Sequence, residues 1–593
     1  MRIVILACAL LLTSPARASW DSFQIIEWQP RNPAQWKTLH GLGVTAGAVV
    51  ANRDGTGPSL DRQTAVLRDF GLGWYIENIA TDFYASYHRY TPGRPVNWRF
   101  LAAQQRYRAA PEDPAALFRE PSLLDPAWRA RISERLIATV RQQAPFHPLY
   151  YSLGDETGIA DLAAVSDFDL SPQSVAGFRT WLRGQYGSLV ALNAEWGTAY
   201  AAWDAIQPET TWQTMRRTDD DFAAWNDFKA WMDTEFADAL RFGTDAIHGA
   251  DPHALSAIEG VQLPGWGGYD YARIAHAVDV MEIYDSDEDL PLIRSINPAV
   301  IPLITSFAAA PSDIHDIWRS VLRGARGLIL WDEDNSIVRP DASPGPRATA
   351  YAAEFAALRG PIGRRLSHAE PLYDPVAILY SPASFRLSWL IDHRHDGDAW
   401  MDRTAENEWQ DNAWRAALRG YSEALAQLGL HPRFITEAQL ADGAPAVSVL
   451  ILPHSIALSG QELQSIATFV AKRGQLIADV PPGQFDWHGR RRIAPNVPAT
   501  IVSPEHLAAV LTLVPAVRVE APNNDVETYL FRSDGRRLLA LQRRTPRDTP
   551  ETITVDLHAQ QARDIATGRD YGRQDHLVLT LGPITPIFLE LRR

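Results

Sequence analysis

The sequence predicts an α/β protein: a (β/α)₈ barrel followed by a small doubly wound α/β domain and an antiparallel β-sandwich. Two observations predict the barrel. Eight short apolar segments alternate with helix-type segments over roughly the first 340 of the 593 residues, as parallel strands covered by helices do. Several of these apolar segments end on a polar or acidic residue, at the position where barrel enzymes place their catalytic groups.

The eight predicted barrel strands are short runs of mainly apolar residues. They cover residues 22–28, 44–52, 72–80, 147–155, 253–262, 278–285, 299–307 and 327–332. Segments with helical spacing lie between them, including residues 35–42, 61–70, 126–143 and 313–322. Because the strand-then-helix unit recurs eight times, we expect the sheet to close on itself.

The composition changes twice after the barrel. Strand and helix alternate again in residues 371–380, 412–430, 446–453, 460–474 and 475–480, which favours a small doubly wound domain. From about residue 498 the pattern turns to short strands at 528–532, 537–542, 552–557 and 577–581. We therefore predict a barrel at residues 19–365, an α/β domain at 366–495 and a β-sandwich at 496–593.

The first 18 residues have the pattern of a secretory signal. Met1-Arg2 is followed by an apolar stretch over residues 3–12, and Ala16-Arg17-Ala18 matches the small-residue cleavage site. We expect cleavage after Ala18 and a periplasmic or secreted protein. The apolar stretch is too short to span a bilayer, so no membrane span is predicted. Cys8, the single cysteine, lies inside this segment, which excludes disulfides and cysteine chemistry from the mature chain.

Composition narrows the class of partner. A net charge of −15 disfavours nucleic acid, because phosphate binding needs the opposite sign. The 20 Trp, 18 Tyr and 20 Phe suit a carbohydrate cleft with flat stacking faces, although a large aromatic core explains any single Trp equally well. No G-x-S-x-G motif and no histidine spacing typical of a metal site occur, so no cofactor and no metal are implied.

Glu156 is the candidate catalytic acid. The fourth predicted strand ends in Gly154-Asp155-Glu156-Thr157-Gly158, which places two acids in a tight, glycine-flanked turn at the barrel rim. Acids at strand ends also cap helices or pair with arginines. Two acids in so tight a turn favour catalysis over that structural role.

Two stretches after the fourth strand carry a family resemblance. Residues 178–189 (FRTWLRGQYGSL) and 192–200 (LNAEWGTAY) look like the F-x-x-W-L-x-x-K-Y-G-S-L and L-N-x-x-W-G-T-x-F stretches of family 42 glycoside hydrolases. The order of barrel, α/β domain and β-domain resembles that β-galactosidase family as well. The resemblance implies that Glu156 is the acid/base, that the substrate is a carbohydrate, and that the α/β domain supports a homo-oligomer, a trimer or dimer. Asp155 stands where the family usually has an Asn that binds the sugar.

The sequence departs from the family at the seventh strand. The family's nucleophile is a glutamate at the end of that strand, but residues 301–307 (IPLITSF) contain no carboxylate. Hydrolysis needs a second carboxylate about 5 Å from the acid for retention, or about 6.5–9.5 Å for inversion. In order of preference, the other strand ends offer Glu333, then Glu282 or Asp285, then Glu259, with Glu77 as a further possibility. Glu333 comes first because two-residue alternation would send it the same way as Trp331.

Aromatic and polar side chains gather near the third, fifth and sixth strand ends. The cluster at the third strand contains Trp74, Tyr75, Glu77, Asn78, Asp82, Tyr84, Tyr87 and His88. Such a mixture suits a sugar pocket, with apolar faces for stacking and polar groups for hydroxyls. We expect the substrate contacts to come from Trp74, Asn78, Asp155, Glu259, Tyr284, Asp285 and Trp331.

These observations predict an exported, β-galactosidase-like glycoside hydrolase that acts on an oligosaccharide or polysaccharide. Glu156 would stay protonated until it is needed, and a second carboxylate would be ionised. Two alternatives remain open. One is a barrel that binds glycans without cutting them, since the nucleophile position is changed; the other is an inverting glycosidase with a relocated second carboxylate.

Overall fold

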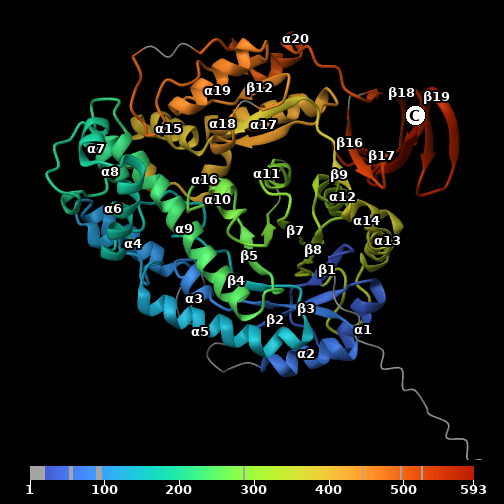
Figure 1. Cartoon of the computed structure of the whole chain (residues 1–593). Helices are drawn as coiled ribbons and strands as arrows, with labels where there is room; N and C mark the ends of the chain where they lie inside the picture. The colour runs from blue at the N-terminus through green and yellow to red at the C-terminus, as the bar shows by residue number, and fades with distance from the viewer. Residues whose placement is uncertain are drawn as a thin grey trace, which may run out of the picture.

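The computed structural model describes residues 20–51, 58–88, 96–284, 288–443, 445–493, 497–522 and 525–592. Figure 1 shows the barrel at the centre, the α/β domain above it and the β-domain at the right. The predicted signal peptide and Asp285 lie outside the described residues. No helix in the described ranges has both the length and the apolar character of a transmembrane segment.

Eight parallel strands close into a barrel in chain order, with the last paired to the first, as predicted. The strands are β1 (Gln24–Glu27), β2 (Ala46–Val50), β3 (Gly73–Glu77), β4 (Tyr151–Asp155), β5 (Ser256–Val261), β6 (Val280–Ile283), β7 (Ile301–Ser306) and β8 (Gly327–Leu330). Their carboxyl ends meet at one rim, so residues that follow β4, β5, β6 and β7 become neighbours there.

Helices surround the barrel (Figure 1). They are α1 (Pro33–Leu42), α2 (Leu60–Asp69), α3 (Thr81–Tyr84), α4 (Trp98–Ala109), α5 (Pro126–Gln143), α6 (Pro172–Tyr186), α7 (Leu189–Trp196), α8 (Thr211–Met215), α9 (Ala223–Ala250), α10 (Tyr271–Ile274), α11 (Asp289–Ile296), α12 (Asp313–Arg323), α13 (Ala348–Arg359) and α14 (Pro361–Ser367). Local signals set several starts: Asn32 and Gln35 form a capping box on α1, and Asp125 caps α5 ahead of a proline.

Side chains alternate between the inside and the outside of the barrel. In β3, Tyr75 points inward and its ring stacks on that of Tyr150, with centroids 4.4 Å apart. Trp74 points outward, is buried under the surrounding helices, and lies 6.1 Å from the ring of Phe146. The predicted substrate contact of Trp74 is therefore wrong, because strand parity turns its ring away from the barrel mouth.

The α/β domain is a five-stranded parallel sheet in the order β11-β10-β12-β13-β14. Its strands are β10 (Val376–Tyr380), β11 (Arg433–Thr436), β12 (Val449–Leu452), β13 (Gln475–Ala478) and β14 (Thr500–Ile501), and its main helices are α15 (Pro382–His393), α16 (Ala405–Gln410), α17 (Ala413–Gln427), α18 (Glu437–Asp442) and α19 (Gly460–Ala471). A doubly wound order of this kind confirms the prediction. The predicted strand 371–380 is shorter than expected, since its first part belongs to another sheet.

Tryptophans fill the junction between the barrel and the α/β domain. The ring of Trp266 lies 6.2 Å from that of Trp225 in α9 and 5.2 Å from that of Trp389 in α15. All three side chains are buried. Much of the aromatic content noted in the sequence is therefore core packing and not a sugar-binding surface.

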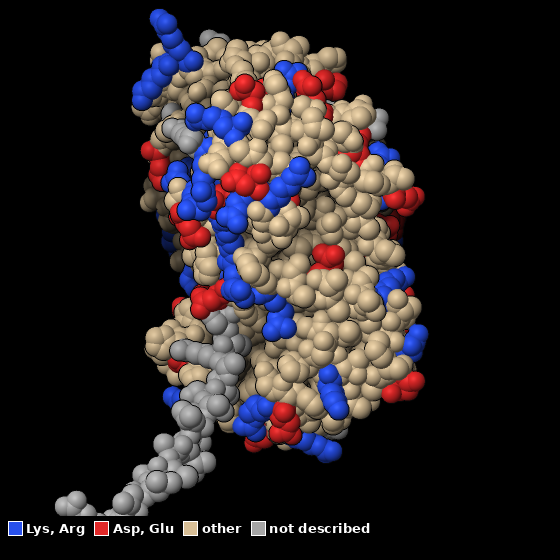
Figure 2. All heavy atoms as spheres, turned by 90° about the vertical axis from the view of Figure 1, so that its right-hand side faces the viewer, with Lys and Arg blue, Asp and Glu red and all other residues tan. Residues whose placement is uncertain are grey.

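The C-terminal domain is an antiparallel sheet with a hydrophobic core of its own. Its strands are β9 (Glu370–Pro371), β15 (Arg518–Glu520), β16 (Val526–Ser533), β17 (Arg536–Arg543), β18 (Glu551–Asp564), β19 (Asp570–Leu581) and β20 (Ile587–Arg592). The short helix α20 (Leu507–Val510) lies just before β15 in the chain. Figure 2 views this side of the molecule, where basic and acidic side chains gather in a band. Arg365 of α14 pairs with Glu590 of β20 at 2.8 Å and ties the domain to the barrel.

Candidate active site

Glu156 lies at the rim directly after β4, with a φ of +49° that side-chain-bearing residues seldom adopt. Its backbone N–H donates to the Glu259 carbonyl in β5 at 2.9 Å, and its side chain is 23% exposed. Gly260, at φ +57°, makes room for it: a Cβ there would lie 2.6 Å from Glu156 Cγ. Strained backbone of this kind concentrates at functional sites, which supports a working role for Glu156.

Two side chains hold the two carboxylate oxygens of Glu156. The Tyr284 hydroxyl donates to Oε1 at 3.1 Å, and His88 Nε2 lies 2.7 Å from Oε2. The other ring nitrogen of His88 lies 2.7 Å from Asp161 Oδ1, and Asn97 donates to Asp161 Oδ2 at 2.9 Å. The structure thus contains a chain of hydrogen bonds that runs from Asn97 to the candidate acid.

The imidazole of His88 is poised between two carboxylates. Burial alone would lower the pKa of His88, but the hydrogen bonds to Asp161 and Glu156 raise it to about 9. His88 is therefore protonated at neutral pH and forms an ion pair with Glu156.

Glu282, the acidic residue of β6, lies at the same rim as Glu156, and β5 separates its strand from β4. Its side chain is 3% exposed; the Gly260 N–H donates to Oε2 at 2.5 Å, and the Thr305 hydroxyl of β7 donates to Oε1. Burial raises the pKa of Glu282 well above its usual range. Because Gly260 touches both acids, Glu282 Oε2 and Glu156 Cγ lie at most about 8 Å apart.

Glu259 and Asp155 lie below these two acids. The Tyr150 hydroxyl donates to Glu259 Oε1 at 3.0 Å inside the barrel. Burial and the nearby Asp155 carboxylate raise the pKa of Glu259 to about 8. Glu259 is thus a fully buried carboxyl in the floor of the site, and a direct sugar contact would need a path past Glu156.

Aromatic rings form one wall of the mouth. Trp28 and Trp331 stack with centroids 4.4 Å apart and planes inclined by 12°. The indole N–H of Trp28 donates to Glu77 Oε1 at 3.1 Å, and Asn78 donates to the same oxygen at 2.9 Å. Trp331 stays half-exposed, as a stacking platform for a sugar requires.

Glu333, the preferred second carboxylate, does not join the cluster. The strand β8 ends at Leu330, and Glu333 lies exposed in a turn beyond it. Within the described part of the chain, Glu333 makes no hydrogen bond or ion pair. The two-residue alternation on which its choice depended stops where the strand stops.

A cleft of about 560 Å³ opens beside these groups. Tyr284, which holds Glu156, and Thr305, which holds Glu282, both line it, together with Phe307. Glu156 and Glu282 are not among its lining residues, most of which belong to the end of β7 and to α12; the two acids approach it only through Tyr284 and Thr305.

Sequence reasoning missed the roles of His88 and Asp161. His88 stood in the aromatic cluster with no assigned role, and Asp161 carried no signal beyond its position five residues after Glu156. Only the fold shows that the segment after β3 crosses over to the end of β4.

Comparison with known proteins finds a partial family match and a shared fold. A sequence model of the glycoside hydrolase family 42 (beta-galactosidase) matches residues 156–290, which span β5, β6 and Glu156 itself. Residues 156–290 are therefore similar to the glycoside hydrolase family 42, over less than half of the chain. No curated protein sequence matches this chain.

Solved structures share the architecture over nearly the whole chain. A catalytic mutant of a family 42 β-galactosidase from G. stearothermophilus matches at 14% identity and a TM-score of 0.66, covering 98% of this chain and 100% of that one. The β-galactosidase from Bacillus circulans sp. alkalophilus matches at 12% identity and 0.69, covering 96% and 99%. An exo-carrageenase of family 42 from Bacteroides ovatus matches at 14% and 0.59, covering 96% and 79%. At such identities these structures show the fold of this chain and nothing more.

Proposed function

We propose that the protein is an exported enzyme that hydrolyses glycosidic bonds of an oligosaccharide or polysaccharide, with Glu156 as the acid/base and Glu282 as the second carboxylate. The main support is that both acids contact Gly260 from neighbouring strands. Their other partners, Tyr284 and Thr305, line one cleft. Two carboxyl groups on either side of a sugar site are what the reaction requires.

Glu156 donates a proton to the leaving oxygen and later accepts one from water. His88 supplies this proton, since it holds one at neutral pH and touches Glu156. Tyr284 and Asp161 are positioning residues: the first orients Glu156, the second orients His88. Proton transfer along this chain of hydrogen bonds keeps a proton donor available at the rim at pH values well above the ordinary pKa of a carboxyl group.

Glu282 acts as the nucleophile or activates the attacking water. Burial favours its protonated form, so Glu282 must first release its proton to water, and the carboxylate that remains carries out the attack. The Gly260 N–H and the Thr305 hydroxyl both point at the carboxylate and stabilise the anion once it forms. Glu282 therefore takes the place of the strand-seven glutamate of the family by reaching across to β7 from β6.

The substrate we propose is a β-galactoside. Several structural neighbours are β-galactosidases, and one is an exo-carrageenase, which extends the proposal from oligosaccharides to polysaccharides. The half-exposed ring of Trp331 supports stacking on a sugar face. Asp155, which replaces the usual Asn, would bind a different arrangement of hydroxyls from that of simple galactosides.

Export and oligomerisation complete the proposal. The segment at residues 1–18 supports export, and the α/β domain supports a homo-oligomer by its resemblance to family 42. N-terminal sequencing of protein from cell fractions tests cleavage after Ala18. Light scattering of the purified chain tests for a dimer or trimer, and a monomeric mass would contradict the second proposal.

Hydrolysis of nitrophenyl glycosides and of plant, algal and bacterial polysaccharides tests the function. We expect turnover by the wild type, a loss of at least a thousandfold in Glu156→Gln and in Glu282→Gln, and no change in Glu134→Gln, an exposed residue of α5. The configuration of the first product, followed by NMR, distinguishes retention from inversion.

Glu333→Gln separates the two candidates for the second carboxylate. Loss of activity in this variant, with an active Glu282→Gln, would move the role to Glu333. Glycan binding without turnover by the wild type would instead support the non-catalytic binding barrel. The assay thus has a result that overturns each part of the proposal.

A further inference from the structure

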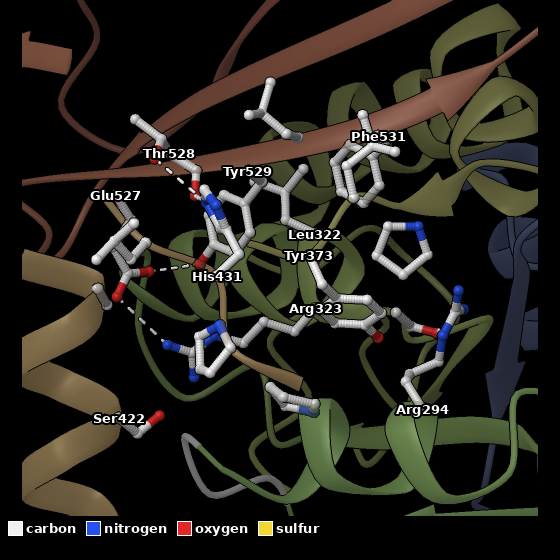
Figure 3. A pocket seen from close by; sticks show the side chains of 18 of the residues that line it. Arg294, Leu322, Arg323, Tyr373, Ser422, His431, Glu527, Thr528, Tyr529 and Phe531 are labelled. Atoms are coloured by element: carbon white, nitrogen blue, oxygen red, sulfur yellow. Dashed lines mark hydrogen bonds and ion pairs between the residues drawn. The ribbon is translucent and has the colours of Figure 1, made fainter. Parts of the chain in front are cut away.

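A second cavity lies where the three domains meet, away from Glu156 (Figure 3). It measures about 130 Å³, opens to the surface, and is lined by α11 and α12 of the barrel, α17 and β11 of the α/β domain, and β16 of the β-domain. Its walls are largely apolar and include the buried side chains of Leu322, Leu430, Phe434 and Phe531. A cavity of this size is comparable to engineered apolar cavities of about 150 Å³ that bind benzene.

Two of the polar groups in this junction pocket are already satisfied by the protein. Glu527 pairs with Arg319 at 3.0 Å and Arg323 at 3.3 Å; although it is buried, these arginines hold its pKa well below its usual range. His431 Nε2 lies 2.6 Å from the Thr528 carbonyl, and its Nδ1 lies 3.1 Å from Asp374. Neither group is available to attract a charged ligand.

Arg294, a third polar residue of the junction pocket, is not satisfied in this way. Its guanidinium makes one long hydrogen bond, 3.4 Å to the Gly324 carbonyl, and within the described ranges no carboxylate lies close enough to pair with it. Burial lowers the pKa of Arg294, an effect that the neighbouring Tyr373 opposes. Figure 3 shows Arg294 and Tyr373 together at one end of the junction pocket.

A half-buried cation without an anion is costly, and the cost falls when an anion binds. The Tyr373 hydroxyl also makes no hydrogen bond to any residue that the structure describes, so two donors at this end lack strong acceptors. The planar guanidinium matches the two oxygens of a carboxylate. The apolar walls exclude a sugar, whose hydroxyls would remain unsatisfied there.

We propose that the junction pocket binds a small carboxylate with an apolar body about the size of a benzene ring. The carboxylate lies between Arg294 and Tyr373, and the body packs against Leu322 and Phe434. Because three domains contribute to the walls, the ligand holds their arrangement together and raises the stability of the folded chain by mass action.

Benzoate is the probe, and benzyl alcohol is its uncharged counterpart. Calorimetric titration of the intact chain should show saturable one-to-one binding of benzoate, with benzyl alcohol at least tenfold weaker. In Arg294→Gln, benzoate binding should weaken at least tenfold while benzyl alcohol binding stays unchanged. The matched control is Arg141→Gln, at an exposed arginine of α5, which should bind benzoate as the wild type does.

Ala426→Leu fills the junction pocket from α17 and leaves Arg294 in place. This variant should lose both ligands, and it decides the matter if Arg294→Gln does not fold. Absence of saturable benzoate binding by the wild type, equal affinity for the two probes, or full affinity in Ala426→Leu would each overturn the proposal. The titration needs no sugar substrate, so its outcome is independent of whether the enzyme cleaves galactosides.

Discussion

Replacing His88 by Gln tests the proton chain at the site directly. In the folded protein the pKa of His88 is about 9, against its ordinary value of 6.5. At about 1.4 kcal/mol for each tenfold change in proton affinity, the interactions of the imidazolium stabilise the fold by about 3 kcal/mol. Glutamine keeps one hydrogen bond to Glu156 or Asp161 but cannot carry a proton.

The raised pKa of His88 determines how the free energy of unfolding depends on pH. A pKa raised in the folded state gives stability that is fully present below pH 6.5 and is lost as the pH rises through about 9. The free energy of unfolding of the wild type, relative to His88→Gln, should therefore fall by about 3 kcal/mol between pH 6 and pH 10. The variant itself should lack this part of the pH dependence.

Urea unfolding, followed by tryptophan fluorescence at several pH values between 6 and 10, measures the difference in free energy of unfolding between the wild type and His88→Gln. His276→Gln, at an exposed histidine of the barrel, is the control and should run parallel to the wild type. If the His88→Gln curve also ran parallel to the wild type, the imidazolium would not be bound by Glu156 and Asp161, and the proton chain would be refuted.

Three further predictions follow from the same geometry. A plot of kcat/KM against pH should be bell-shaped. Its acid limb should lie above pH 4.5, because burial raises the pKa of Glu282, and its alkaline limb should lie near pH 9, the pKa of His88. An acidic optimum would contradict both assignments. Gly260→Ala should lower kcat/KM at least tenfold with the fold retained by circular dichroism, since its Cβ would lie 2.6 Å from Glu156 Cγ, and wild-type activity would show that this approach is unimportant. Glu527→Gln should destabilise the chain by about 3–5 kcal/mol by leaving Arg319 and Arg323 without their anion. A calorimetric loss below about 1 kcal/mol would count against the importance of these ion pairs between the barrel and the β-domain.

The barrel could be predicted because its elements are local. Each strand is a short apolar run and each helix has its own spacing or cap, so the eight strands appear within a few residues of their predicted positions. The prediction for residues 371–380 was partly wrong for the opposite reason. Glu370 and Pro371 pair with β16, about 160 positions later in the chain, and no local sequence pattern predicts such a partner.

The site was predicted in part. Glu156, Glu282 and Tyr284 lie together at the rim, since all three sit at the carboxyl ends of neighbouring strands. The choice of Glu333 extended strand alternation beyond the end of β8, and the choice of Trp74 assumed the wrong strand parity. Both errors concern side-chain direction, which depends on where a strand ends and how it tilts in the closed sheet.

The sequence by itself determined the succession of strands and helices, the closure of the barrel and the acids at its strand ends, because hydrophobic period and turn residues act over a few positions. Tertiary structure alone decided that His88 and Asp161 join Glu156, that Glu282 reaches Thr305, and that Arg294 has no anion among the residues that the structure describes. These contacts join segments far apart in the chain. Their geometry arises only when the whole barrel and its neighbouring domains are packed, and the charges then respond to burial that no single segment creates.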